Sequence, residues 1–163
     1  MIFVTTGTQA PFDRLIKAVD EILPFLNGEE VIAQSCAAEY KPINMKTVEF
    51  LSPAAFFDCL IKADLIVSHA GMGTVISAMS ASKPIIVMPR LASLREHRND
   101  HQLATVKKLK EMNFGKVVNS PLEMKNAIFS VLQNVDEQSV QSINKFASEE
   151  LLESISGYIN SIR

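Results

Sequence analysis

Short runs of β-branched and other apolar residues alternate along this chain with longer segments of helical spacing. The runs predict six strands, at residues 2–5, 31–34, 47–51, 65–67, 85–88 and 116–118. Between them, apolar residues recur every three or four positions over 15–26 and 103–112. Strands that are apolar on both faces and separated by helices pair in parallel through right-handed crossovers. The pattern therefore predicts an α/β fold: a doubly wound, mostly parallel six-stranded sheet.

Two further helix starts are marked by a serine followed by a proline. Ser52 precedes Pro53 and Ser120 precedes Pro121, and this order is typical of a capping residue followed by a first-turn proline. A chain of 163 residues fits one domain. We expect that domain at 1–135 and a helical tail at 136–163, which packs on its own domain or docks on another chain.

Charge and cysteine content exclude several classes of partner. The formal charge is −2 and no basic run occurs, so nucleic acid is not expected as a partner. Cys36 and Cys59 match no metal or redox spacing, which favours buried thiols in a reducing compartment. No apolar stretch reaches the roughly 20 residues that span a bilayer, and the first residues lack the basic leader of a signal peptide. We expect a cytoplasmic protein whose membrane association is peripheral or through a partner.

Three loops are expected to meet at the carboxyl ends of the strands, where open α/β sheets bind ligands. In the first, "TTGTQAPF", Gly7 permits a tight turn, and Thr6, Thr8 and Gln9 offer hydroxyl and amide groups. This glycine alone does not make the dinucleotide fingerprint that would follow a first strand, so a nicotinamide-dependent enzyme is disfavoured.

The second loop, "SHAGMGTVISAM" at 68–79, predicts an anion site. Gly71 and Gly73 remove side chains so that backbone N–H groups can approach an anion at a helix start, and Thr74 adds a hydroxyl. A glycine pair after a strand is also common in tight strand-to-helix turns that bind nothing.

The third loop carries "REHRNDHQLA", in which Asn99, Asp100, His101 and Gln102 open a helix. Such a cluster suits recognition of hydroxyl groups, although Asn99 and Asp100 also suit helix capping. His97 and His101 lie one helical turn apart without the zincin glutamate between them, so no metal site is expected.

The run at 63–89, "ADLIVSHAGMGTVISAMSASKPIIVMP", and "NDHQ" at 99–102 resemble the carboxyl-terminal domain of family 28 glycosyltransferases, which have the GT-B fold. The opening "MIFVTTGTQAPFDRLIKAVD" and the chain length resemble stand-alone members of that group. These are the small subunit of the two-subunit UDP-N-acetylglucosamine transferase that extends dolichol-linked sugar, and PssE-like subunits of exopolysaccharide and capsule synthesis. The resemblance implies a Rossmann-like half of a GT-B enzyme.

The resemblance also implies roles for individual residues toward a UDP-sugar donor substrate, with no further cofactor. The implied diphosphate contacts are Gly7, Thr8, His69, Gly71, Gly73 and Thr74. Asp100, His101 and Gln102 would bind the donor sugar. Ser77 stands where two-domain peptidoglycan members carry the glutamate that grips the ribose, which is a departure from the family.

A GT-B enzyme needs a second α/β domain to hold its acceptor. We expect only one such domain in this chain. The stand-alone relatives imply a membrane-associated partner subunit that supplies the acceptor half and recruits the chain to the inner face of the membrane. The implied function is inverting transfer of a hexose or hexose derivative to a lipid-linked sugar acceptor. His69 is a candidate for the catalytic base; the alternative is a base on the partner subunit. Arg90, Arg95 and Arg98 are candidates to stabilise the leaving diphosphate. The alternative is a non-catalytic nucleotide-sugar-binding subunit that regulates or scaffolds a partner.

Overall fold

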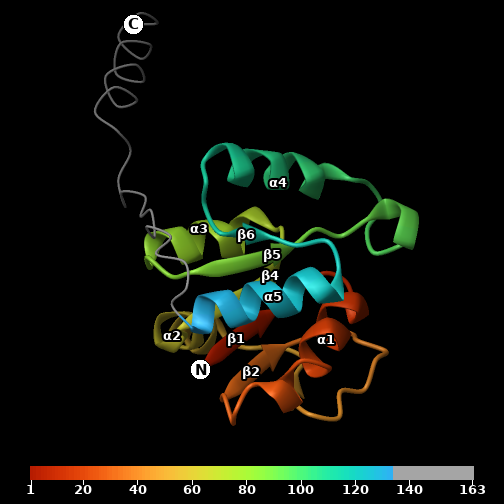
Figure 1. Cartoon of the computed structure of the whole chain (residues 1–163). Coiled ribbons are helices and arrows are strands. Elements are labelled where there is room, and N and C mark those ends of the chain that lie inside the picture. Colours follow the sequence, from red (N-terminus) through yellow and green to blue (C-terminus); the bar gives the residue numbers. More distant parts are fainter. Residues whose placement is uncertain (134–163) are drawn as a thin grey trace, which may run out of the picture.

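Parallel strands form the centre of the molecule, in the order β3-β2-β1-β4-β5-β6 (Figure 1). The computed structural model describes residues 1–133, so the predicted tail at 136–163 lies outside the described residues. The strand order reverses between β1 and β4, as in a doubly wound sheet. The predicted fold class is therefore confirmed, and all six predicted strands are present: β1 (Ile2–Thr5), β2 (Val31–Gln34), β3 (Thr47–Val48), β4 (Leu65–His69), β5 (Ile85–Met88) and β6 (Lys116–Val117).

Helices cover both faces of this sheet (Figure 1). Alternate residues of β1 face opposite sides, so that Ile2 and Val4 belong to one buried cluster and Phe3 to the other. The first cluster is completed by α1 (Asp13–Asp20) and α5 (Pro121–Leu132), and the second by α2 (Pro53–Lys62), α3 (Met72–Ser80) and α4 (His101–Glu111). The central strands are thereby buried on both faces.

The register of the strands places several loops at one edge of the sheet. Thr5 lies opposite Gln34 on one side and Ser68 on the other, and His69 lies opposite Met88. Since all strands run in the same direction, the segments that follow β1, β2, β4 and β5 leave the sheet at this carboxyl edge. The turn between β5 and α4 includes a short 3₁₀ segment at Ala92–Leu94.

Both predicted serine caps are confirmed. The Ser52 hydroxyl accepts a hydrogen bond of 3.2 Å from the backbone N–H of Ala55, at the start of α2. The Ser120 hydroxyl accepts one of 3.2 Å from the N–H of Glu123, at the start of α5. Each cap satisfies a backbone donor that the first helical turn leaves without an intrahelical partner.

Two elements end three or more residues earlier than their apolar patterns predict. The helical spacing continues to Leu26, but α1 ends at Asp20 and a 3₁₀ turn at Leu23–Phe25 follows, because Pro24 cannot continue an α-helix. The third strand was predicted to reach Leu51, yet β3 ends at Val48. β3 lies at the edge of the sheet with both residues exposed, and residues 49–51 leave it and turn toward α2.

Candidate functional site

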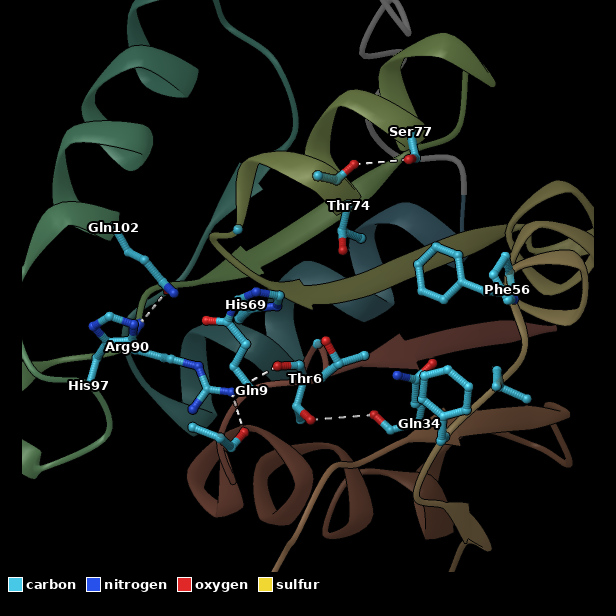
Figure 2. A pocket seen from close by; sticks show the side chains of 18 of the residues that line it. Thr6, Gln9, Gln34, Phe56, His69, Thr74, Ser77, Arg90, His97 and Gln102 are labelled. Atoms are coloured by element: carbon cyan, nitrogen blue, oxygen red, sulfur yellow. Dashed lines mark hydrogen bonds between the residues drawn. The ribbon is translucent and has the colours of Figure 1, made fainter.

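A cavity of about 780 Å³ opens at the carboxyl edge of the sheet, where the strand order reverses (Figure 2). It is lined by the segment after β1, by the start of α3, by the turn before α4, and by residues near the start of α2. Figure 2 shows His69 in the middle, with Gln34 and Phe56 toward one end and His97 and Gln102 toward the other. The three loops predicted to meet do meet here.

The start of α3 presents backbone donors to this cavity. Gly71 is the N-cap residue, with an extended backbone, and no side chain of the described residues caps the helix. Gly73 and Thr74, in the first turn, both line the cavity. The backbone N–H groups of a first turn lack intrahelical acceptors and carry about half a positive charge between them. This end of α3 is therefore suited to an anion.

The glycines of the site have two different roles. Apart from its chain neighbours and the backbone of its own helix, a Cβ on Gly73 would meet no atom of the described residues within 4 Å, so its bare Cα faces open space in the cavity. A Cβ on Gly71 would overlap the His69 ring, and one on Gly7 would lie 2.8 Å from His69 Cε1. Gly71 thus makes room for the imidazole, and because it also lines the cavity, its expected contact with an anion stays a prediction.

The His69 side chain is held between these glycines and lines the cavity. Its Nδ1 lies 3.3 Å from the Ser68 hydroxyl. Burial of the ring, with a smaller contribution from the positive charge of Arg90, lowers the pKa of His69 to about 4. His69 is therefore neutral at pH 7 and can donate or accept a hydrogen bond, but it is a weak base.

Arg90 lies against the cavity with its guanidinium engaged by backbone carbonyls. Nη2 donates to Thr6 O at 2.8 Å and to Ala10 O at 2.7 Å, and Nη1 donates to Pro11 O and to Glu96 O. Its side chain also stacks over Phe12, with 4.7 Å between Cζ and the ring centroid. Arg90 thus fixes the loop after β1 and contributes positive charge to the cavity, while Arg98 lines the cavity with an exposed side chain.

Of the three predicted sugar-binding residues at the start of α4, two line the cavity and one does not. His101 and Gln102 line the cavity, and the buried Gln102 accepts a hydrogen bond of 3.0 Å from the N–H of Arg90 through Oε1. Asp100 is the N-cap residue of α4, is not among the lining residues, and accepts a hydrogen bond of 2.8 Å from the N–H of Ala92. Its carboxylate therefore stabilises the preceding turn.

The remaining predicted contacts lie around the same cavity. Gly7 and Thr8 line it, and the hydroxyl of Thr5 accepts a hydrogen bond of 3.2 Å from the Gly7 N–H, which helps to fix the turn. Ser77 lines it from the second turn of α3, and its hydroxyl donates to Gly73 O at 2.9 Å. Within residues 1–133 no group of three or more His, Cys, Asp or Glu could hold a metal ion.

One end of the cavity is lined by residues that no sequence motif marks. Gln34, at the end of β2, lines this end together with Phe50, Leu51 and Phe56. These four residues belong to no motif in the sequence. The signal that would have found Gln34 is its position as the last residue of a strand that neighbours β1, together with its polarity in an otherwise apolar run.

Together, the doubly wound sheet and an elongated cavity with an uncapped helix start at its centre define a Rossmann-like ligand-binding domain. The chain matches the glycosyltransferase family 28 C-terminal domain over residues 1–155, and it belongs to this family. A comparison with curated protein sequences gave no match. No helix within residues 1–133 is long and apolar enough to cross a membrane.

Solved structures share the fold at low sequence identity. The kitacinnamycin glycotransferase has a TM-score of 0.64 at 16% identity, over 85% of this chain and 36% of that one. The UDP-GlcNAc 2-epimerase from Neisseria meningitidis, bound to UDP-GlcNAc, has a TM-score of 0.63 at 12% sequence identity, over 98% of this chain and 44% of that one. The solution structure of ALG13 has a TM-score of 0.54 at 17% sequence identity, over 94% of this chain and 93% of that one. This chain therefore spans less than half of the first two proteins and nearly all of ALG13, and the likeness confirms a fold of the GT-B type.

Proposed function

We propose that this chain is the donor-binding subunit of a UDP-sugar-dependent glycosyltransferase, which transfers a hexose or hexose derivative to a lipid-linked acceptor. The observation that carries the proposal is the uncapped start of α3, with the open Cα of Gly73, at the centre of an elongated cavity. A diphosphate at this position would accept hydrogen bonds from the first-turn N–H groups, and the helix start favours its charge.

The ends of the cavity suggest how the rest of the donor would lie. His101 and Gln102 supply polar groups for sugar hydroxyls at one end, and Phe50, Leu51 and Phe56 supply an apolar surface for a base at the other. Gly7, Thr8 and His69 would contact the diphosphate between them, with Ser77 near the ribose. No metal or further cofactor is part of the proposal.

The catalytic step needs stabilisation of the leaving diphosphate and a base for the acceptor hydroxyl. The start of α3 and the positive charge of Arg90 would stabilise the leaving group. Because its pKa is about 4, His69 suits a hydrogen bond to the donor better than proton abstraction. We therefore place the base on a membrane-associated partner subunit that binds the acceptor, so that the complex works at the cytoplasmic face of the membrane.

The low pKa of His69 also favours one alternative, a non-catalytic subunit that binds a nucleotide sugar and regulates a partner. The two functions differ in one measurement. Transfer of labelled sugar to a lipid acceptor by the reconstituted complex supports the enzyme. Donor binding with no transfer in that complex supports the regulatory subunit.

The central experiment is a titration of the purified chain with UDP, with ADP, GDP and NAD as comparators, for the wild type and Gly73→Ala. The added methyl group is accommodated by the protein and should stabilise α3 by up to about 1 kcal/mol, since alanine is the better helix former. We expect it to weaken UDP binding at least about tenfold, because it fills the space next to the helix start.

Ser80→Ala is the matched control, because Ser80 is exposed in the last turn of the same helix. It should leave UDP affinity unchanged. Equal affinity of Gly73→Ala and the wild type would remove the start of α3 from the site, and equal affinity for all four nucleotides would refute a UDP site.

A further inference from the structure

One polar side chain at the apolar end of the cavity lacks a partner. Gln34 is 1% exposed and lines the cavity, and its Oε1 has no hydrogen-bond partner among the described residues. Its backbone is fixed, since Gln34 O accepts a hydrogen bond of 3.1 Å from the N–H of Thr6. A buried acceptor without a partner costs about 1 to 3 kcal/mol of stability. Such groups are rare in folded proteins and call for an explanation.

A second buried oxygen without a partner, Ser35 Oγ, follows directly in the chain. Ser35 lies just beyond the end of β2 and is not among the residues that line the cavity. The two oxygens therefore do not form one site. Of the two residues, only Gln34 lines the cavity.

The chemistry of the unpaired oxygen restricts what could pair with it. A carboxamide oxygen only accepts hydrogen bonds, and a fully ionised diphosphate has none to donate. Gln34 is also three strands away from β5 in the order β2-β1-β4-β5, which is about 14 Å at the usual strand spacing. Figure 2 likewise separates Gln34 from His97 and Gln102. The partner of Gln34 therefore belongs to the end of the ligand opposite the sugar.

The surroundings of Gln34 favour a base over a ribose. Phe50, Leu51 and Phe56 line the same end of the cavity, and flat apolar side chains suit the faces of a heteroaromatic ring. We propose that Gln34 is a specificity-determining residue that accepts a hydrogen bond from the ring N–H of a pyrimidine base. This inference rests on the proposed function, because it assumes that the ligand is a uridine nucleotide.

The experiment compares wild type, Gln34→Met and Gln133→Met in titrations with UDP, 3-methyl-UDP and 2′-deoxy-UDP. Methionine keeps the length of the side chain and removes the acceptor. Gln133 is exposed at the end of α5, so the same change there is the control. The 3-methyl group removes the ring N–H, and the 2′-deoxy ligand removes one ribose donor.

We expect the wild type and Gln133→Met to bind 3-methyl-UDP about tenfold more weakly than UDP, the worth of one hydrogen bond. In Gln34→Met we expect UDP to bind about tenfold more weakly, and the difference between UDP and 3-methyl-UDP to disappear. Unfolding in urea provides a second readout: without ligand, Gln34→Met should be at least as stable as the wild type, because it no longer buries an unpaired oxygen. Gln34→Leu repeats both measurements if the methionine variant does not fold.

Three outcomes would overturn the inference. UDP binding of unchanged strength in Gln34→Met overturns it while leaving the proposed function intact. If Gln34→Met instead removes only the difference in affinity between UDP and 2′-deoxy-UDP, the partner of Gln34 is the ribose and the base assignment is wrong. Failure of the wild type to bind UDP overturns the proposed function and this inference together.

Discussion

The His69 imidazole fills the space that two glycines leave free, and this packing can be tested by substitution. Gly71→Ala should lower the free energy of unfolding by about 1 to 3 kcal/mol, because the new methyl group would overlap the ring. In a His69→Ala background the same change should cost much less. Gly7 offers a contrast, since its φ of +77° keeps Gly7→Ala strained by roughly 1 kcal/mol even without the ring.

Urea unfolding of the four combinations of Gly71→Ala and His69→Ala gives the coupling energy directly. A coupling near zero would show that Gly71 serves something other than the ring, such as close approach of a ligand. The substitution of Gly71 therefore tests packing, whereas the substitution of Gly73 tests binding.

The lowered pKa of His69 predicts a pH dependence of stability. The pKa is about 4 in the folded chain and 6.5 in the reference state, so the unfolded chain binds more protons between these values. Stability should therefore fall as the pH is lowered through this window, by about 3 kcal/mol in total, and level off below pH 4 for this group.

Urea unfolding of the wild type and His69→Asn at intervals from pH 7 to pH 4 measures this effect. The variant should lose most of the slope between pH 6.5 and pH 4, and His101→Asn should keep it. A slope that survives in His69→Asn would assign the pH dependence to other groups.

At the scale of elements, Arg90 joins the end of β5 to the loop between β1 and α1. Its guanidinium donates to carbonyls of Thr6, Ala10 and Pro11 in that loop. Arg90→Lys should lower the free energy of unfolding by about 2 to 4 kcal/mol, because an ammonium group cannot reproduce the planar set of donors and leaves buried carbonyls without partners.

The control for this prediction is Arg95→Lys, since Arg95 is exposed on the neighbouring turn. Chemical denaturation should place Arg95→Lys within about 0.5 kcal/mol of the wild type. If Arg90→Lys also falls in that range, the carbonyl contacts of Arg90 contribute little to holding the loop.

The elements show which parts of the fold a sequence can predict. The serine caps of α2 and α5 were predictable because the signal lies within three residues of the helix start. The early end of α1 follows from Pro24, whereas the apolar spacing continues past this proline and predicts a longer helix. The early end of β3 follows from its place at the sheet edge, which depends on the order of all the strands and not on residues 47–51 alone.

The same distinction holds for the site. Gly73, His101 and Gln102 were predicted to serve it and do line the cavity, because each lies in the first turn of a helix that follows a strand. No motif marks Gln34, since its place at the cavity depends on β2 pairing beside β1 and on α2 covering that face. Asp100 does not line the cavity, because its carboxylate accepts a hydrogen bond from Ala92 in the preceding turn, and its contact with a donor sugar stays a prediction.

At the scale of the whole molecule, the cavity crosses the sheet from β2 to the segment after β5, so a ligand laid along it should protect these segments in a fixed order. We expect hydrogen exchange to slow in three steps. UMP should protect the end of β2 and residues 50–57, UDP should add residues 71–75, and a UDP-sugar should add residues 97–102.

Hydrogen–deuterium exchange of the wild type with each ligand at saturation measures these steps, and Gly73→Ala provides the control. In that variant the protection at 71–75 should be lost before that at 50–57, because the methyl group affects the diphosphate and not the base. Protection of 97–102 by UMP alone would reverse the orientation of the donor. The base would then lie at the start of α4 and the sugar against Gln34, and the acceptor subunit would have to approach from the side of α2.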